Sequence, residues 1–240
     1  MAAKHQYKIF NWLSLFLVGM LITPFISSCG KQNGASPKGL NIQYNVINLS
    51  PDMGPVNLFI NFIQVNAAGN PFVFGVDGGY FYLPSVAVPF QFRLANTAAT
   101  PVLALNRTDD LKSGAKYTLF ITGSYSSLTP IFTVDTDFAP TTGRGKLRFV
   151  NASPSAIGGL DVYANDTLAF SQVAYKSQTK YVELPVGNYD LKITTTGSTN
   201  VLNDQPSVLI QDGRLYTLYT YGYTSRADSA AFNAAIITNR

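Results

Sequence analysis

Apolar and polar residues alternate in short runs along most of this 240-residue chain. From Asn41 onward, runs rich in Val, Ile, Phe, Tyr and Thr recur about every ten residues, separated by Gly, Pro, Asn and Asp. Such spacing is typical of a β-sandwich or barrel built from many short strands. Apolar residues at helical spacing do not persist beyond two turns, and only residues 227–235 could form a helical turn. The pattern therefore predicts an all-β fold.

The strand pattern occurs twice. Residues 46–51 (VINLSP) match residues 149–154 (FVNASP), and residues 111–123 (LKSGAKYTLFITG) match residues 210–222 (IQDGRLYTLYTYG). The offset between matched residues drifts only from 103 to 99, so length differences are confined to loops. A period of this size is that of a domain and not of a solenoid. We predict two tandem immunoglobulin-like antiparallel β-sandwich domains, residues 41–137 and 145–240, joined by residues 138–144.

Each repeat contains a Gly-x-x-Tyr segment, at Gly114 to Tyr117 and at Gly213 to Tyr216. An apolar strand residue stands three places before each glycine. The segments resemble the tyrosine corner of immunoglobulin-like domains, in which the phenol bonds the backbone across a Greek-key crossing. We expect both tyrosines to lie inside sandwich cores.

Alternation assigns the two faces of the strands that contain these tyrosines. Residues of one parity are expected inside the cores: Tyr117, Leu119, Ile121, Tyr216, Leu218 and Thr220. The opposite face carries Phe120 in the first repeat and Tyr219 and Tyr221 in the second. These three aromatic residues could form an exposed binding platform or the interface between the two domains. We favour the interface.

The first thirty residues follow the three-part plan of a secretory signal. A basic segment is followed by the mostly apolar residues 9–22 and by two serines before Cys29, the only cysteine. The apolar run is shorter than the roughly 20 residues needed to span a bilayer as a helix. Residues 26–29 (ISSC) resemble the bacterial lipobox, in which the cysteine is lipidated and the signal is cut just before it.

This resemblance predicts a lipoprotein signal peptide over residues 1–28 and a lipid-anchored flexible tether over residues 29–40. The alternative is an uncleaved membrane anchor with a free thiol. Gly30 stands where an aspartate would resemble the inner-membrane retention signal of enteric bacteria. We therefore expect export and lipid anchoring to the bacterial cell envelope, at the outer membrane.

Signal cleavage changes the inventory of reactive side chains. It removes the only histidine, His5, and the only tryptophan, Trp12. It also removes two lysines, which takes Lys+Arg from 17 to 15 against 13 Asp+Glu and the net charge from +4 to +2. No Lys/Arg-rich block indicates nucleic-acid binding. With no histidine and an alkylated cysteine, a Ser-His-Asp centre, a Cys-His centre or an ordinary zinc site cannot form. We expect no catalytic residue, metal or cofactor.

Two further polar features remain open. Asp161 alternates with apolar neighbours, which predicts that it faces solvent or a turn. Asp166-Thr167-Leu168 and Asp228-Ser229-Ala230 resemble an O-glycosylation acceptor of some Gram-negative exported proteins. Sequence alone does not decide whether either segment is glycosylated.

The second repeat also carries residues that resemble the family called domain of unknown function 4397. They are residues 146–154 (KLRFVNASP), residues 160–163 (LDVY), Tyr175-Lys176, Tyr181, residues 184–187 (LPVG) and residues 212–217 (DGRLYT). The first repeat resembles the family more loosely, so the chain is expected to hold two tandem copies. The resemblance implies a secreted or lipid-anchored bacterial surface protein with β-sandwich domains. It implies no catalytic residue.

We therefore expect a non-enzymatic, lipid-anchored protein that displays two sandwiches to a protein or cell-wall partner. The alternative is a carbohydrate-binding surface module, because the chain has 14 tyrosines and 16 phenylalanines on which sugar rings could stack. Against this alternative, the mature chain would contain no tryptophan. A hydrolase is not expected.

Overall fold

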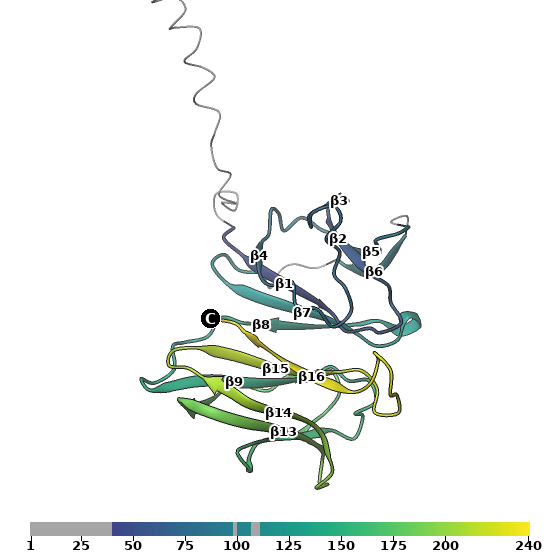
Figure 1. Cartoon of the computed structure of the whole chain (residues 1–240). Coiled ribbons are helices and arrows are strands. Elements are labelled where there is room, and N and C mark those ends of the chain that lie inside the picture. The colour runs from purple at the N-terminus through teal and green to yellow at the C-terminus, as the bar shows by residue number, and fades with distance from the viewer. Residues whose placement is uncertain (1–39, 98–99, 107–110) are drawn as a thin grey trace, which may run out of the picture. The chain divides into compact units, whose positions relative to one another are not determined.

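Alternation of apolar and polar residues produces eight strands in each repeat, counted over the residues that the structure describes (Figure 1). The computed structural model describes residues 40–97, 100–106 and 111–240. The first repeat contains β1 (Gln43–Asn48), β2 (Val56–Ile60), β3 (Ile63–Gln64), β4 (Phe81–Tyr82), β5 (Phe90–Leu94), β6 (Pro101–Leu105), β7 (Lys116–Thr122) and β8 (Thr129–Val134). The second repeat contains β9 (Arg144–Asn151), β10 (Leu160–Ala164), β11 (Thr167–Val173), β12 (Val182–Pro185), β13 (Gly187–Thr195), β14 (Val201–Ile210), β15 (Leu215–Tyr221) and β16 (Asn233–Thr238). One turn of 3-10 helix, Tyr125–Ser127, precedes β8.

Each repeat is a sandwich of two four-stranded sheets with the same strand order, so the predicted fold class is confirmed. The sheets are β4-β1-β7-β8 and β3-β2-β5-β6 in the first repeat, and β12-β9-β15-β16 and β11-β10-β13-β14 in the second. Paired strands are antiparallel except for β1–β7 and β9–β15, which are parallel. Each parallel pair joins the first strand of a repeat to its seventh, and parallel strands require a long connection of this kind.

Several predicted features fall outside this description. The predicted signal, residues 1–28, and Cys29 lie outside the described residues, as does the tether except for Leu40. Within the part of the chain that is described, no helix is long and apolar enough to cross a membrane. The described residues belong to one compact unit.

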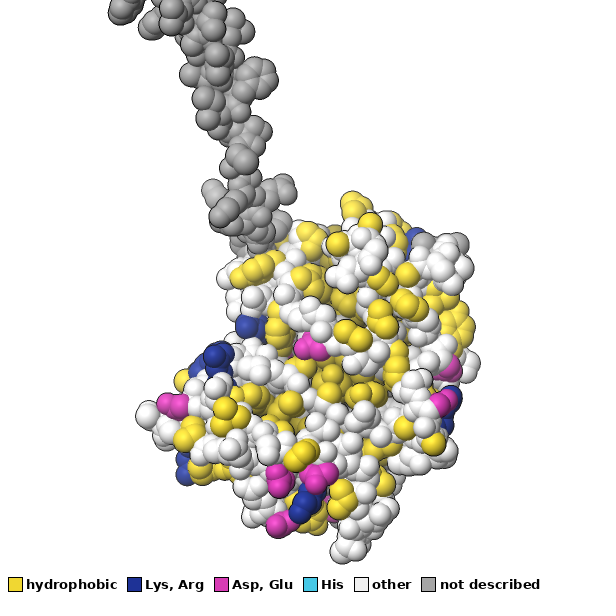
Figure 2. All heavy atoms as spheres, in the orientation of Figure 1, with side chains coloured by type: hydrophobic (Ala, Val, Ile, Leu, Met, Phe, Trp, Pro, Cys, Tyr) yellow, Lys and Arg dark blue, Asp and Glu magenta, His cyan; other side chains and the backbone are white. Residues whose placement is uncertain are grey.

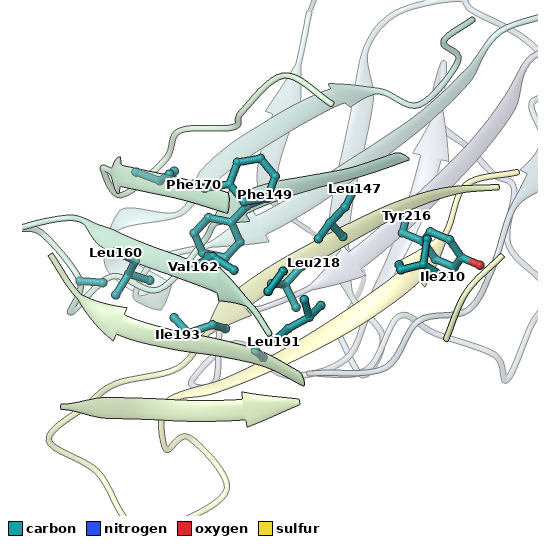
Figure 3. Close-up of a cluster of buried hydrophobic side chains, with 14 residues drawn as sticks. Leu147, Phe149, Leu160, Val162, Phe170, Leu191, Ile193, Ile210, Tyr216 and Leu218 are labelled. Carbon is teal, nitrogen blue, oxygen red and sulfur yellow. The ribbon is translucent and has the colours of Figure 1, made fainter. Parts of the chain in front are cut away.

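Each sandwich closes on its own hydrophobic core, and Figure 3 shows the core of the second repeat. The inward positions predicted from alternation are confirmed. Tyr117, Leu119 and Ile121 pack in the first core, and Tyr216 and Leu218 pack in the second. Full burial of a large apolar side chain contributes about 1.5–3 kcal/mol, so these inward residues supply the main driving force for each sandwich.

A third hydrophobic cluster joins the outer faces of the sheets β4-β1-β7-β8 and β12-β9-β15-β16. Its buried members come from both repeats: Ile47, Leu49, Phe120, Ile131, Val150, Ala152, Tyr219 and Ile237. The central strands of these sheets are therefore buried on both faces. In β7, all residues after Lys116 are buried. Strands buried on both faces read as nearly continuous apolar runs, which is why the sequence alone left the role of the outer face open.

Both predicted tyrosine corners are present and make the same bond. The Tyr117 hydroxyl accepts a hydrogen bond from the Lys112 N–H at 2.8 Å. The Tyr216 hydroxyl accepts one from the Gln211 N–H at 3.2 Å. The glycine three residues before each tyrosine has a φ of +78° or +72°, a conformation that a side chain would strain. Each phenol therefore ties the start of its strand to the loop that precedes it.

The Asn-x-Ser-Pro segments shared by the two repeats are turns closed by a buried asparagine. The Asn151 side-chain oxygen accepts a hydrogen bond from the Ser153 N–H at 3.2 Å, and the Asn48 oxygen accepts one from the Ser50 N–H at 3.1 Å. The Asn151 amide also donates to the Val173 carbonyl at 2.9 Å. This bond ties β9 in one sheet to β11 in the other, so the asparagine holds the sandwich closed at that end.

Of the two settings expected for Asp161, solvent is wrong because its side chain is buried, and a turn is confirmed because Thr196 and Gly197, in the turn after β13, both bond its carboxylate. It accepts hydrogen bonds from the N–H groups of Gln172 (2.7 Å) and Gly197 (3.1 Å) and from the hydroxyls of Ser171 and Thr196 (both 3.2 Å). A register shift in the β10–β11 pair accompanies this arrangement, and alternation does not reveal it. Burial raises the pKa of Asp161, but hydrogen bonds to its charged form outweigh burial and hold the pKa below its ordinary value.

We predict that Asp161→Asn weakens the fold and flattens its response to acid. The unfolded carboxyl titrates near 3.9 and the folded carboxyl below that value. The stabilisation is therefore complete above the unfolded pKa and is lost as the pH falls through the folded pKa. Removing the carboxylate from its four donors should cost about 1–3 kcal/mol at neutral pH. Urea unfolding at about pH 7 and about pH 3 measures both effects, and an identical pH dependence in the two proteins would contradict the prediction.

Candidate functional site

The three aromatic residues assigned to one face lie where the two repeats meet. Phe120 and Tyr219 are buried, with ring centroids 5.2 Å apart. Tyr221 is half-buried, 6.1 Å from Tyr219 and 5.8 Å from Phe74 of the first repeat. Burial raises the pKa of both tyrosines. Because Phe120 and Tyr219 hold matching positions, the repeats meet in a locally two-fold manner. These rings pack the repeats together and do not form an open platform.

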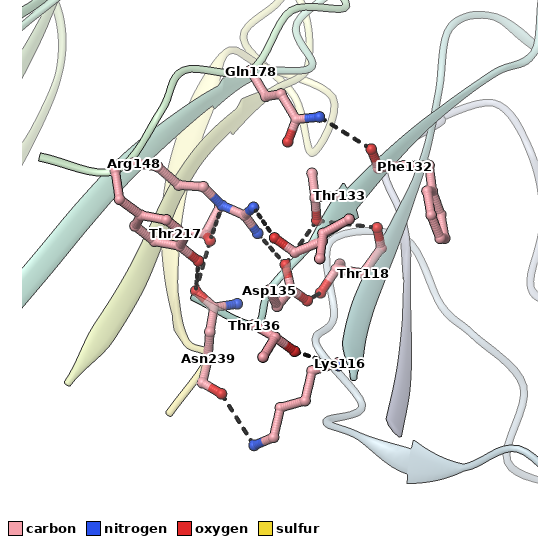
Figure 4. A network of polar contacts seen from close by, with 12 residues as sticks. Lys116, Thr118, Phe132, Thr133, Asp135, Thr136, Arg148, Gln178, Thr217 and Asn239 are labelled. Atoms are coloured by element: carbon pink, nitrogen blue, oxygen red, sulfur yellow. Dashed lines mark hydrogen bonds and ion pairs between the residues drawn. The ribbon is translucent and has the colours of Figure 1, made fainter. Parts of the chain in front are cut away.

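A polar centre is buried on the same pair of sheet faces, around the carboxylate of Asp135 (Figure 4). Asp135 accepts hydrogen bonds from the hydroxyls of Thr118 (2.6 Å), Thr133 (2.9 Å) and Tyr80 (2.8 Å). Arg148 of the second repeat forms an ion pair with the same carboxylate. The carboxylate is therefore neutralised from across the boundary between the repeats.

The Arg148 guanidinium makes further contacts with both repeats. It donates to the Val134 carbonyl of the first repeat at 2.7 Å and to the Thr217 hydroxyl of the second at 2.8 Å. Its central carbon, Cζ, also lies 4.8 Å from the centroid of the Tyr181 ring, in a cation–π contact. Partners of this kind offset the desolvation of a buried ion pair, whereas removal of one ion leaves the other uncompensated.

The two repeats contribute residues at matching positions to the polar centre, but these residues differ in charge. Asp135 directly follows β8 and Asn239 directly follows β16, at matching positions in the strand registers. Asn239 accepts a hydrogen bond from Thr217 at 2.7 Å, as Asp135 does from Thr118. Its amide also donates to the Tyr80 hydroxyl at 2.8 Å. One half of the centre thus holds a charged pair, and the matching half holds a neutral amide.

These groups form a closed hydrogen-bonded network. Burial raises the pKa of Tyr80 above its ordinary value and that of Tyr181 to about 12, so both phenols stay protonated at neutral pH. Among the residues that the structure describes, no group of three or more His, Cys, Asp or Glu side chains could hold a metal ion. The sequence reasoning missed this centre. The available signal was Arg148, a charged residue that shares its parity with apolar Val150 in β9.

A second feature is a pocket of about 340 Å³ on the first repeat. The second repeat has the seven-residue strand β11 where the first has the two-residue β3, and residues 65–80 form an irregular segment instead. This segment and β4 line the pocket, which we call the loop pocket. Phe72, Val73, Val76, Phe81 and Tyr82 supply its apolar lining, and Val73, Val76 and Tyr82 are exposed.

One stretch of the first repeat contains far fewer charged side chains than the matching stretch of the second. Residues 51–92 contain two charged side chains, Asp52 and Asp77, whereas the matching residues 154–193 contain seven. On the face seen in Figure 2, hydrophobic side chains gather over the first repeat and charged ones mostly surround the second. Sparse charge together with exposed apolar side chains is typical of a surface that contacts another molecule. Composition averaged over the whole chain conceals this difference.

The other candidate residues lie either at the surface or before Leu40, the first residue that the structure describes. Cys29 precedes the described residues. Thr167 and Ser229 of the possible glycosylation acceptors are both exposed. Asp166, next to Thr167, pairs with Lys192 at 2.7 Å. Thr167 and Ser229 line neither the loop pocket nor the polar centre.

Comparisons with known proteins identify a family. A family model described as Domain of unknown function (DUF4397) matches residues 43–158 and again residues 156–239. No curated protein matches the chain. Among solved structures, a leucine-rich repeat protein from Bacteroides thetaiotaomicron matches with 17% identity and a TM-score of 0.17. That match covers 73% of this chain and 25% of the other, so this chain spans a quarter of that protein's length.

We predict that Asp135→Asn destabilises the protein by about 3–5 kcal/mol, because it leaves the Arg148 guanidinium buried without a counter-charge. The double variant Asp135→Asn/Arg148→Met should regain much of this loss, since a buried pair can be replaced by neutral groups at little cost. Urea unfolding of the full chain measures both changes.

The matched control is Asp228→Asn, which breaks the exposed ion pair between Arg226 and Asp228. Exposed pairs of this kind add little, so its unfolding midpoint should not move. Equal effects of Asp135→Asn and Asp228→Asn would show that the polar centre does not stabilise the fold.

Proposed function

This chain belongs to the DUF4397 family, with two adjacent copies, and we propose that it is a non-enzymatic, lipid-anchored protein of the bacterial cell envelope. Lipid on Cys29 holds it at the outer membrane, and the two sandwiches display surfaces to a protein or cell-wall partner. The lipobox-like residues 26–29 support the anchor. The observation that carries the binding proposal is the scarcity of charged side chains in residues 51–92 of the first repeat.

The first repeat has the features of a recognition surface. Its loop pocket is concave, and its rim carries the exposed apolar side chains Val73, Val76 and Tyr82. Binding residues are commonly placed on loops held by a rigid scaffold, and contact surfaces are depleted in charge. The second repeat, with the more charged surface, then serves as a soluble partner that packs against the first.

Carbohydrate binding is the second candidate, and Tyr82 favours it. Its side chain is 45% exposed at the rim of the loop pocket, where the face of a sugar ring could pack against it. Asn70 in the lining offers an amide for hydroxyl recognition. The loop pocket combines apolar side chains with polar groups, and polar groups placed in this way can fix the orientation of a small ligand.

The anchor is tested by labelling cells with radioactive palmitate. The unsubstituted protein should incorporate label into the mature chain, and Cys29→Ala should not, because the thiol is the acceptor. Ser28→Ala is the matched control, since another small residue before the cysteine should leave labelling intact. Label retained by Cys29→Ala would contradict the anchor.

The partner is tested with a photoreactive amino acid placed at Val76, in the loop pocket, or at Val201, in the second repeat. Both side chains are about half-exposed, so the two sites match in accessibility. Irradiated native membranes should give a defined cross-linked product from position 76 and not from position 201. A product that contains peptides of a second protein indicates a protein partner, and one whose added mass is removed by cell-wall hydrolases indicates a glycan. No product at either position, or the same products at both, would contradict binding through the first repeat.

A further inference from the structure

The hairpin between β2 and β3 ends in exposed apolar side chains. Phe62 is 62% exposed and Ile63 is 69% exposed. Val88, also exposed, lies next to them, because the Asn61 N–H donates to the Pro89 carbonyl at 3.0 Å. We call Phe62, Ile63 and Val88 the apolar tip.

The backbone at the apolar tip is unfavourable for the residue it carries. Asn61 and Phe62 have φ of +46° and +67°. In the matching hairpin of the second repeat, Asn165 and Asp166 have φ of +48° and +63°. Asn, Asp and Gly are the residues that tolerate this turn, whereas a bulky side chain there is an outlier that costs folding free energy. A strained, exposed Phe62 contributes little to the fold, so it points to a contact outside it.

The apolar tip lies at the end of the first repeat where the described chain begins. Residues 83–89 connect the two places: Leu83 donates to the Ile42 carbonyl at 3.0 Å beside the start of β1, and Pro89 accepts from Asn61 at the tip. Figure 1 shows β3 and the start of β1 at the top of the molecule. The chain therefore enters the fold at the same end as the tip.

The sequence limits how far the described fold can lie from the anchor at Cys29. Leu40 is 11 residues after Cys29, and a chain extends at most about 3.6 Å per residue, so Leu40 lies within about 40 Å of the anchor. This step rests on the proposed function, because it takes Cys29 to be lipidated. A tether of this length lets the apolar tip reach the lipid surface.

We propose that the apolar tip inserts into the lipid surface to which Cys29 anchors the chain. Phe and Ile side chains enter the boundary between headgroups and acyl chains readily, and the residues from Met53 to Val76 carry no charge that would oppose this. Lys112, in the loop before β7, is a cation at the same end of the sandwich and suits phosphate headgroups. A convex tip enters a fluid lipid layer directly, whereas a protein partner would have to supply a fitted pocket. Lipid is therefore the favoured occupant.

The test uses the full chain, purified from membranes and reconstituted in phosphatidylcholine vesicles whose acyl chains carry bromine. Ile63→Trp places a fluorophore at the apolar tip, and Thr167→Trp places one at the matching exposed position of the second repeat. Bromine quenches tryptophan on contact. The Ile63→Trp chain should lose fluorescence and emit at shorter wavelength, and the Thr167→Trp chain should do neither. The unsubstituted chain reports any signal from Trp12.

Phe62→Asp in the Ile63→Trp background provides a second control. It gives the hairpin the residue that the second repeat holds at this position, so the fold should be retained while quenching is lost. Equal quenching of the Ile63→Trp and Thr167→Trp chains, or none in either, would overturn lipid insertion, as would Ile63→Trp quenching that survives Phe62→Asp. Palmitate labelling of the same preparations reports the anchor separately. A labelled chain with an unquenched tip refutes the insertion alone, and an unlabelled chain refutes the anchor.

Discussion

The central strands β1, β7, β9 and β15 are each packed between two hydrophobic layers, and the arrangement of the protein depends on this constraint. One face of each strand fills the core of its own sandwich, and the other face packs against the neighbouring repeat. Exposing the second face would return Phe120, Tyr219 and their neighbours to water. Two sandwiches with such strands are therefore most stable when packed together, and the described residues form one compact unit accordingly.

The polar centre adds specificity to this apolar contact. Hydrophobic burial is largely non-directional and would tolerate several alignments of two sheets. The Asp135–Arg148 pair, with its hydroxyl partners, is satisfied in only one alignment, because a shift of either sheet would leave a buried charge without its partner. Charge on one half of the centre and an amide on the other make the two repeats unequal partners. The asymmetry extends to the surface, where residues 51–92 of the first repeat contain only two charged side chains and the loop pocket is found in the first repeat.

Sequence reasoning predicted what local patterns encode. Period-two alternation identified the strands, the Gly-x-x-Tyr segments identified both tyrosine corners, and the repeat fixed the tandem architecture. It failed where a residue's surroundings come from distant segments. Solvent remained one of two settings expected for Asp161 because alternation reports only which face a side chain takes, not what covers that face. Asp135 and Arg148 lie on either side of the connection between the repeats, and only the packing of the two sheets reveals their contact. The loop pocket was missed because it depends on a strand shortened in one repeat only.

The central claim is that the two repeats fold as one unit through their shared interface, and unfolding of a Phe120→Ala chain tests it most directly. Phe138, 88% exposed in the connection between the repeats, provides the control. If the interface forms in solution, Phe120→Ala should lower the unfolding free energy of the full chain by about 3–5 kcal/mol within a single transition. Phe138→Ala should change it by no more than about 0.5 kcal/mol. Similar small effects of both substitutions, or two separate unfolding transitions in the unsubstituted chain, would contradict the account.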